Sequence, residues 1–152
     1  MATLADVRFQ MRMLGYGGFL LSRGEVRELP SLLREGEKIE QAIYGGYEGG
    51  FGMMVATNHR LMFIDRRFFH KHISEIPYPA ISAVELDTNA IRGSVTIFAR
   101  GSAISLHGIS NKHARNFFNF IDGKIDIPQE RPEAKTEERS REILPETLAL
   151  PR

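Results

Sequence analysis

The sequence predicts an α+β fold that is mainly β: a seven-stranded antiparallel barrel or sandwich, capped by a C-terminal helix and preceded by an N-terminal helical segment. The first observation behind this is a hairpin, because the apolar runs 51–56 and 61–64 flank the polar stretch TNHR. Short alternating segments on either side of the hairpin bring the predicted strands to seven. An apolar stripe at helical spacing follows the last strand.

Composition and charge set the broad class of the protein. Its 152 residues suffice for one domain with a core, and 42% hydrophobic with 26% charged residues is ordinary for a globular protein. A net charge of +1 gives no bulk attraction to nucleic acid, so we predict no nucleic-acid partner. The absence of cysteine excludes disulfides, thiolate metal sites and cysteine nucleophiles. The sequence has no apolar run typical of a signal peptide or a membrane span, so we expect a cytoplasmic protein.

Residues 1–34 are expected to form the N-terminal helical segment, with helices over 3–14 and 23–33. Ser22, followed three residues later by Glu25, predicts a capping box at the start of the second helix. The segment is too apolar for a free arm, so it either folds back over a sheet or packs on a neighbouring copy of the chain. The interface residues in the second alternative are Phe19, Leu20 and Leu21.

Residues 35–127 are expected to form the main domain, and 128–152 a charged tail that is predicted to be disordered. The predicted strands are 38–47, 51–56, 60–64, 73–78, 82–87, 95–99 and 103–107. The second and third strands are apolar on both faces, so we expect both faces to be covered. Asn58 is the residue best suited to unusual backbone angles in the turn between them. The helix begins at Asn111, and its stripe consists of Ala114, Phe117, Phe118, Ile121 and Ile125.

Several stretches of this chain, in order and at the right spacing, carry a family resemblance: VRELPSLL at 26–33, GE at 36–37, GY at 46–47, VATNHRLMFID at 55–65 and IPYPAI at 76–81. With them the chain resembles the bacterial pleckstrin-homology (PH) domains of the YokE-like type over about residues 25–125. The resemblance implies a PH-like fold, with two roughly orthogonal antiparallel sheets and the helix from Asn111 closing one end. It also implies a scaffold without known catalysis, similar in some members to domains that assemble into symmetric rings.

The first strand-to-strand loop does not fit one well-known PH activity. Eukaryotic PH domains bind phosphoinositides through basic residues in this loop, which here would be residues 47–51. The loop has no lysine or arginine and carries Glu48, so we expect no phosphoinositide recognition by that route.

The basic and aromatic stretch at 66–72 is the strongest binding candidate. Its cations suit phosphates and its rings can insert between lipid headgroups. The alternative is an edge-strand extension whose charges keep it soluble. His70 and His72 would share one strand face, but no carboxylate follows closely, so we predict no metal site. The binding candidates are Arg66, Arg67, Phe68, Phe69 and Lys71.

Catalysis and cofactor binding have little support in the sequence. Ser105 and His107 share a strand face, but no third group completes a nucleophilic arrangement. The glycine-rich stretch 45–50 lacks the lysine and helix start of a phosphate loop. We therefore predict no enzyme and no cofactor, and expect an interaction module that self-assembles as a homo-oligomer or docks a protein partner. The alternative is a peripheral membrane adaptor that binds anionic lipid through residues 66–72.

Overall fold

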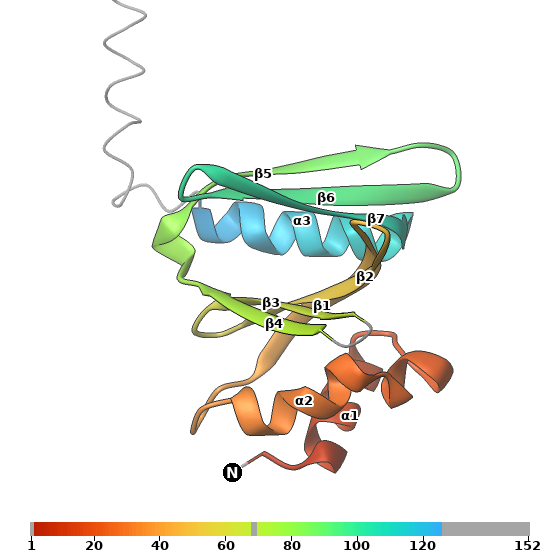
Figure 1. Cartoon of the computed structure of the whole chain (residues 1–152), viewed down its shortest axis with the longest axis vertical. Coiled ribbons are helices and arrows are strands. Elements are labelled where there is room, and N and C mark those ends of the chain that lie inside the picture. Colours follow the sequence, from red (N-terminus) through yellow and green to blue (C-terminus); the bar gives the residue numbers. More distant parts are fainter. Residues whose placement is uncertain (1, 68–69, 126–152) are drawn as a thin grey trace, which may run out of the picture.

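One curled sheet of seven antiparallel strands, in the order β4-β3-β2-β1-β7-β6-β5, forms the body of the protein. The computed structural model describes residues 2–67 and 70–125, and at residues 19, 22, 66, 67, 70 and 71 it describes the backbone alone. Strands β1–β4 make the lower layer in Figure 1 and β5–β7 the upper layer, with α3 packed against both. This half-barrel with a C-terminal helix confirms the predicted fold class. The predicted tail, 128–152, lies outside the described residues.

All the predicted strands and helices are present, with shifted ends. Their bounds are α1 (Leu4–Met13), η1 (Gly18–Ser22), α2 (Gly24–Leu32), β1 (Ile39–Tyr47), β2 (Gly50–Thr57), β3 (Leu61–Arg67), β4 (His70–Ile76), η2 (Tyr78–Ala80), β5 (Ile81–Thr88), β6 (Arg92–Ala99), β7 (Ser102–Ser110) and α3 (Asn111–Ile125). The β4 strand ends before Pro77, which cannot donate to a sheet ladder. It begins within the basic stretch, so residues 66–67 and 70–72 of that stretch are strand in their backbone.

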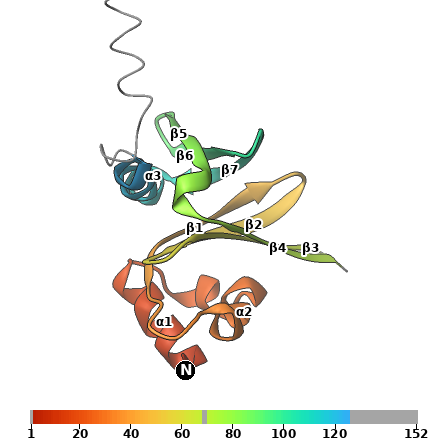
Figure 2. The same ribbon diagram turned by 90° about the vertical axis from the view of Figure 1, so that its left-hand side faces the viewer.

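The N-terminal segment folds back over the outer face of the lower layer, as one of the two alternatives predicted. Figure 2 shows α1 and α2 beneath β1–β4, on the side away from α3. Their buried residues, including Val7, Met11 and Leu29, form one core cluster with side chains of β1, β2 and β3. Tyr16 adds a second attachment, because its hydroxyl donates to the Ala42 carbonyl at 2.5 Å and its ring stacks on His113 of α3.

The second core lies inside the curled sheet. The apolar stripe of α3 contributes Ala114, Phe117 and Ile121, all fully buried against inward-facing residues of both layers. The two layers meet where Gly46 of β1 pairs with His107 of β7. A Cβ atom at the neighbouring Gly45 would lie only 2.5 Å from the His107 carbonyl oxygen, so this close crossing requires glycine. Strands β2 and β3 are buried on both faces, which confirms the expectation of two coverings.

The capping box predicted at Ser22 is wrong. Helix α2 begins at Gly24 with Arg23 as its N-cap and no side-chain cap, because η1 continues through Ser22. Glu25 is instead buried, with its carboxylate 3.5 Å from the Arg23 Nε. A capping box does form at the start of α1, between Thr3 and Asp6.

The structural role of Asn58 also differs from the one predicted. The non-glycine residues with positive φ among those described are Glu48 (43°) and Arg100 (55°). The Asn58 side chain instead bridges to the loop before β1, accepting from the Lys38 N–H at 2.8 Å and donating to the Gly36 carbonyl at 3.2 Å. The loop before β1 therefore stabilises the turn between β2 and β3 through these two hydrogen bonds.

A buried ion pair between Glu37 and Arg60 lies beneath this turn. The Arg60 Nε donates to Glu37 Oε2 at 2.8 Å and a terminal nitrogen donates to Oε1 at 2.9 Å. The Thr57 hydroxyl donates to Oε2 at 2.6 Å and the Arg34 N–H to Oε1 at 2.8 Å. Burial alone raises the pKa of the Glu37 carboxyl, but these hydrogen bonds outweigh it and lower the pKa to about 2.

The remaining donors of Arg60 extend the pair into neighbouring elements. One terminal nitrogen donates to the Leu32 carbonyl at the end of α2 at 2.6 Å. The other pairs with Glu75 of β4 at 2.6 Å. The second Glu75 oxygen lies 3.2 Å from an Arg34 guanidinium nitrogen. We call Glu37, Thr57, Arg60 and Glu75 the clamp, because they join α2, the β2–β3 turn and β4.

Replacing Met11 by alanine tests how much the N-terminal layer contributes to stability. Met11 is fully buried in the outer core, so Met11→Ala should lower the free energy of unfolding by about 2–5 kcal/mol. Met13 lies on the same helix with 71% of its surface exposed, so Met13→Ala should change it by less than about 0.5 kcal/mol. Urea unfolding measures both, and equal effects would contradict the packing described.

The clamp predicts a specific loss of stability in acid. The pKa of Glu37 is about 2 in the folded chain against an ordinary value of 4.5, so its contribution is complete above pH 4.5 and is lost as the pH falls towards 2. Glu37→Gln should lower the free energy of unfolding by about 3–5 kcal/mol at neutral pH. The difference in the free energy of unfolding between this variant and the native chain should become smaller in acid. The neighbouring exposed Glu35 provides the control, and a Glu35→Gln chain that behaved like Glu37→Gln would contradict this assignment.

Candidate functional site

An aromatic stack stands at the end of the lower layer where β1 turns into β2. The rings of Tyr44 and Phe51 are nearly parallel, at 9°, with centroids 5.5 Å apart. The Arg23 guanidinium lies over the Tyr44 ring, 5.0 Å from its centroid. We use "aromatic stack" for these three residues. Phe51 remains 52% exposed, so the stack presents an apolar ring to solvent.

Strand register places the basic stretch next to this stack. Gly52 pairs with Asp65, so Phe51 and Arg66 are the next positions along β2 and β3. Arg66 in turn pairs with Lys71 across β3 and β4. The backbone thus brings two of the predicted binding residues to the end of the sheet that carries Phe51. The side chains of Arg66, Arg67 and Lys71, and the whole of Phe68 and Phe69, lie outside the described residues.

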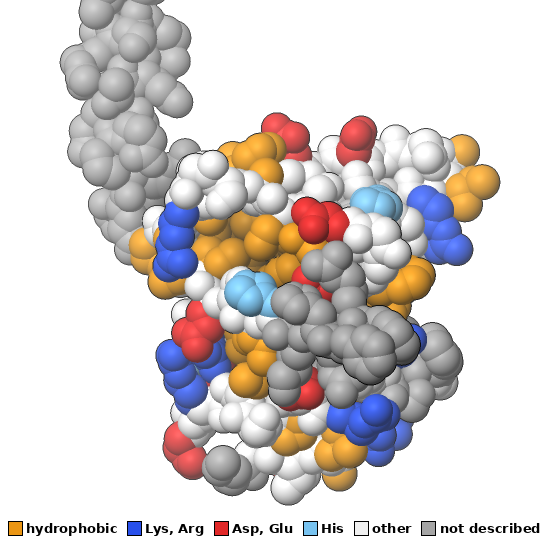
Figure 3. Space-filling model, in the orientation of Figure 1, with side chains coloured by type: hydrophobic (Ala, Val, Ile, Leu, Met, Phe, Trp, Pro, Cys, Tyr) orange, Lys and Arg blue, Asp and Glu red, His pale blue; other side chains and the backbone are white. Residues whose placement is uncertain are grey.

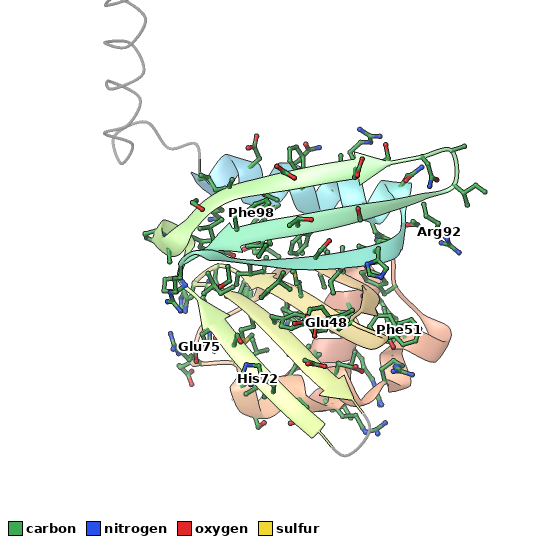
Figure 4. The ribbon with its side chains drawn as sticks, turned by 45° about the horizontal axis from the view of Figure 1, so that its top comes forward. Glu48, Phe51, His72, Glu75, Arg92 and Phe98 are labelled. Atoms are coloured by element: carbon green, nitrogen blue, oxygen red, sulfur yellow. The ribbon has the colours of Figure 1, made fainter. Side chains whose placement is uncertain are left out.

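Acidic groups also surround the stack. Burial raises the pKa of the Tyr44 hydroxyl, and the nearby Glu25 carboxylate raises it further, so Tyr44 is a neutral phenol. Glu48 forms the β1–β2 turn with a positive φ of 43°. Figure 4 shows Glu48 and Phe51 at the same end of the sheet. This end therefore combines an exposed ring with both signs of charge.

The other predicted interface residues lie in η1. Leu21 is buried at 7% exposure in the outer core, and Leu20 packs against the same cluster while half-buried. The side chain of Phe19 lies outside the described residues. Leu21 therefore serves the packing of the N-terminal segment within its own chain.

The residues considered for catalysis are both described, whereas the side chain of His70, one of the two histidines considered for a metal site, lies outside the described residues. The Ser105 hydroxyl accepts from the Thr96 hydroxyl at 2.9 Å, and no hydrogen bond joins it to His107 among the described contacts. His72 shares a hydrogen bond of 3.1 Å with Ser74. Within residues 2–67 and 70–125, no group of three histidine, aspartate or glutamate residues could hold a metal ion. None of the helices in that part of the chain is long and apolar enough to cross a membrane.

Sequence reasoning missed the aromatic stack. The sequence places Tyr44 in an alternating strand, Phe51 at the start of an apolar run and Arg23 at the start of a helix, with no signal that joins the three. The signal that was present is the short hairpin between β1 and β2, which brings residues 44 and 51 onto one face near its turn. The contact with Arg23 depends on the docking of the N-terminal segment, which no local pattern encodes.

Comparison with known proteins supports the fold. The family model described as the bacterial PH domain matches residues 33–122. This agrees with the resemblance drawn from the sequence, while the narrower YokE-like type stays a prediction. No curated protein sequence matches the chain.

Three solved structures resemble this chain, and the one with a TM-score of 0.50 supports the fold. A pleckstrin homology domain from Shewanella amazonensis has 18% identity and a TM-score of 0.50, covering 64% of this chain and 92% of its own. A DUF1696 family protein with a pleckstrin-homology domain from Shewanella loihica has 22% identity, a TM-score of 0.44, and coverage of 65% and 91%. The C-terminal domain of an unknown protein from Leishmania infantum has 15% identity, a TM-score of 0.47, and coverage of 66% and 94%. At these identities the likeness concerns the fold and not the ligand.

Proposed function

Because the chain belongs to the bacterial PH domain family, we propose that it is a non-enzymatic interaction module that docks a protein partner, which includes a second copy of itself. The single observation that supports this best is the exposed aromatic stack at the end of the sheet. The fold itself supports a scaffold and names no ligand.

The composition of the stack resembles the centre of a protein interface. Tyrosine, phenylalanine and arginine are enriched in the buried cores of such interfaces, where a few residues carry most of the binding energy. Tyr44 contacts both Arg23 and Phe51, so its ring loses little freedom when a partner covers it. Phe51 supplies an exposed apolar surface to be buried.

Photo-crosslinking in cells that naturally make the protein tests this proposal. Phe51→p-benzoylphenylalanine should yield a discrete crosslinked product, which mass spectrometry identifies as this chain or another protein. The control places the same residue at Ile91, which is 73% exposed at the β5–β6 turn. Gel filtration with light scattering then gives the subunit number as a multiple of 17.2 kDa. Crosslinked products that are equal at positions 51 and 91, or absent at both, would contradict the proposal that the aromatic stack binds a partner.

An anionic membrane surface is the second candidate, and the register of β3 and β4 favours it. Arg66 pairs with Lys71 across β3 and β4, and the strand register places Arg66 next to the position of Phe51 on β2. Cations that pair with lipid phosphates and a ring that enters the headgroup layer would bind such a surface together. Glu48 at the same turn weakens this attraction, which is why we place it second.

Liposome co-sedimentation tests the membrane candidate. The native chain should sediment with vesicles rich in phosphatidylglycerol and not with phosphatidylcholine vesicles. The triple variant Arg66→Ala, Arg67→Ala, Lys71→Ala should lose this binding, since each basic residue near an anionic surface contributes about 1 kcal/mol. High salt should have the same effect. Sedimentation that the triple variant leaves unchanged would remove the membrane candidate.

A further inference from the structure

Strand β4 has a free edge on the open side of the curled sheet. It lies at one end of the strand order and pairs only with β3 among the described strands. A free edge presents a row of backbone N–H and C=O groups to which an extended peptide can add as a further strand. A free edge alone does not indicate which peptide would bind. The residues beside the edge provide that information.

A pocket with apolar walls and a polar rim lies between this edge and the upper layer. Its volume is about 130 Å³, and its apolar walls are Ile76 of β4, with Ile97, Ala99 and Ile104 of β6 and β7. Cavities of about 150 Å³ with aliphatic walls bind benzene, so there is room for one branched aliphatic side chain. Figure 3 shows hydrophobic side chains gathered in the hollow between the two layers.

The geometry of β4 links the pocket to its edge. Ser74 and Ile76 are opposite Phe63 and Leu61, residues of the inner core, so they share the inward face of the sheet. Both also line the pocket. Side chains of an added strand alternate in the same way, so every second one would face inward. One of them would then meet the pocket.

The charged residues at the rim of the pocket indicate which other residue a bound peptide should carry. Arg100, in the β6–β7 turn, lines the pocket and forms no ion pair with a carboxylate of the described residues. Glu75, the acid on the same rim, already pairs with Arg34 and Arg60. Figure 4 shows Glu75 at the outer side of β4. An acidic residue of a bound peptide would therefore find an available cation in Arg100.

We propose that the β4 edge and its pocket bind an extended segment of a protein partner, with one aliphatic side chain in the pocket and an aspartate or glutamate two residues away, on the same strand face, paired with Arg100. This surface is separate from the aromatic stack. A test of this peptide site is therefore independent of a test of the aromatic stack.

Selection from a random peptide library displayed on phage tests the proposal with the full chain as bait. Enriched peptides should carry leucine, isoleucine or valine, with aspartate or glutamate two residues away. Synthetic copies should bind, by fluorescence anisotropy, with affinity that Ser102→Phe lowers roughly ten- to hundredfold, because the ring blocks a pocket sized for one aliphatic side chain. Ser102 is exposed, so this change leaves folding intact, which urea unfolding checks. Arg100→Glu should weaken binding, whereas Arg100→Lys should keep most of it.

Two further readouts identify the edge that is used. Amide hydrogen exchange at residues 72–76 should slow when a selected peptide binds, since added backbone hydrogen bonds protect them. Ser82→Phe, at an exposed position on the opposite edge strand β5, is the matched control and should leave binding unchanged. No enrichment on the full chain, binding that survives Ser102→Phe, or protection of β5 in place of β4 would each overturn the proposal.

Discussion

The buried pair of Arg60 and Glu37 is the interaction on which the arrangement of the chain depends. A buried ion pair costs more in desolvation than it returns unless its remaining donors and acceptors are also satisfied. Here both Glu37 oxygens accept two hydrogen bonds each, and Arg60 donates through all three nitrogens. These partners come from α2, the loop before β1, the β2–β3 turn and β4. The clamp therefore fixes where the N-terminal layer meets the sheet.

The N-terminal layer in turn gives the two halves of the sheet different surroundings. The lower layer is covered by α1 and α2 outside and by the inner core within, which explains strands that are apolar on both faces. The upper layer is covered on its inner face, where α3 packs, and exposes residues such as Glu85 and Asp87 on the other. Covering the lower layer also brings Arg23 over Tyr44 and so builds the aromatic stack. The same packing that stabilises the fold thus also positions an exposed aromatic surface.

The surfaces proposed for binding share one origin in the geometry of a half-barrel. A sheet that curls without closing leaves strand ends at its rim and free edges at its sides. The aromatic stack stands at the rim, and the β4 pocket at the open side. Both use residues that the core does not need, such as Phe51 and Arg100, which are exposed. Changes at these exposed positions would therefore leave the core of the scaffold intact.

Local patterns in the sequence predict the helices and strands of this fold. The apolar runs around TNHR specified a hairpin, and the stripe from Ala114 to Ile125 specified the closing helix, because periods of two and 3.6 residues are local properties. Local signals failed where the neighbouring structure intervened: η1 displaced the cap expected at Ser22, and the loop before β1 recruited Asn58 as a bridge. Tertiary structure alone decided the clamp, the aromatic stack and the β4 pocket. Each joins residues far apart in the chain, and their contacts exist only once strand register and helix docking are fixed.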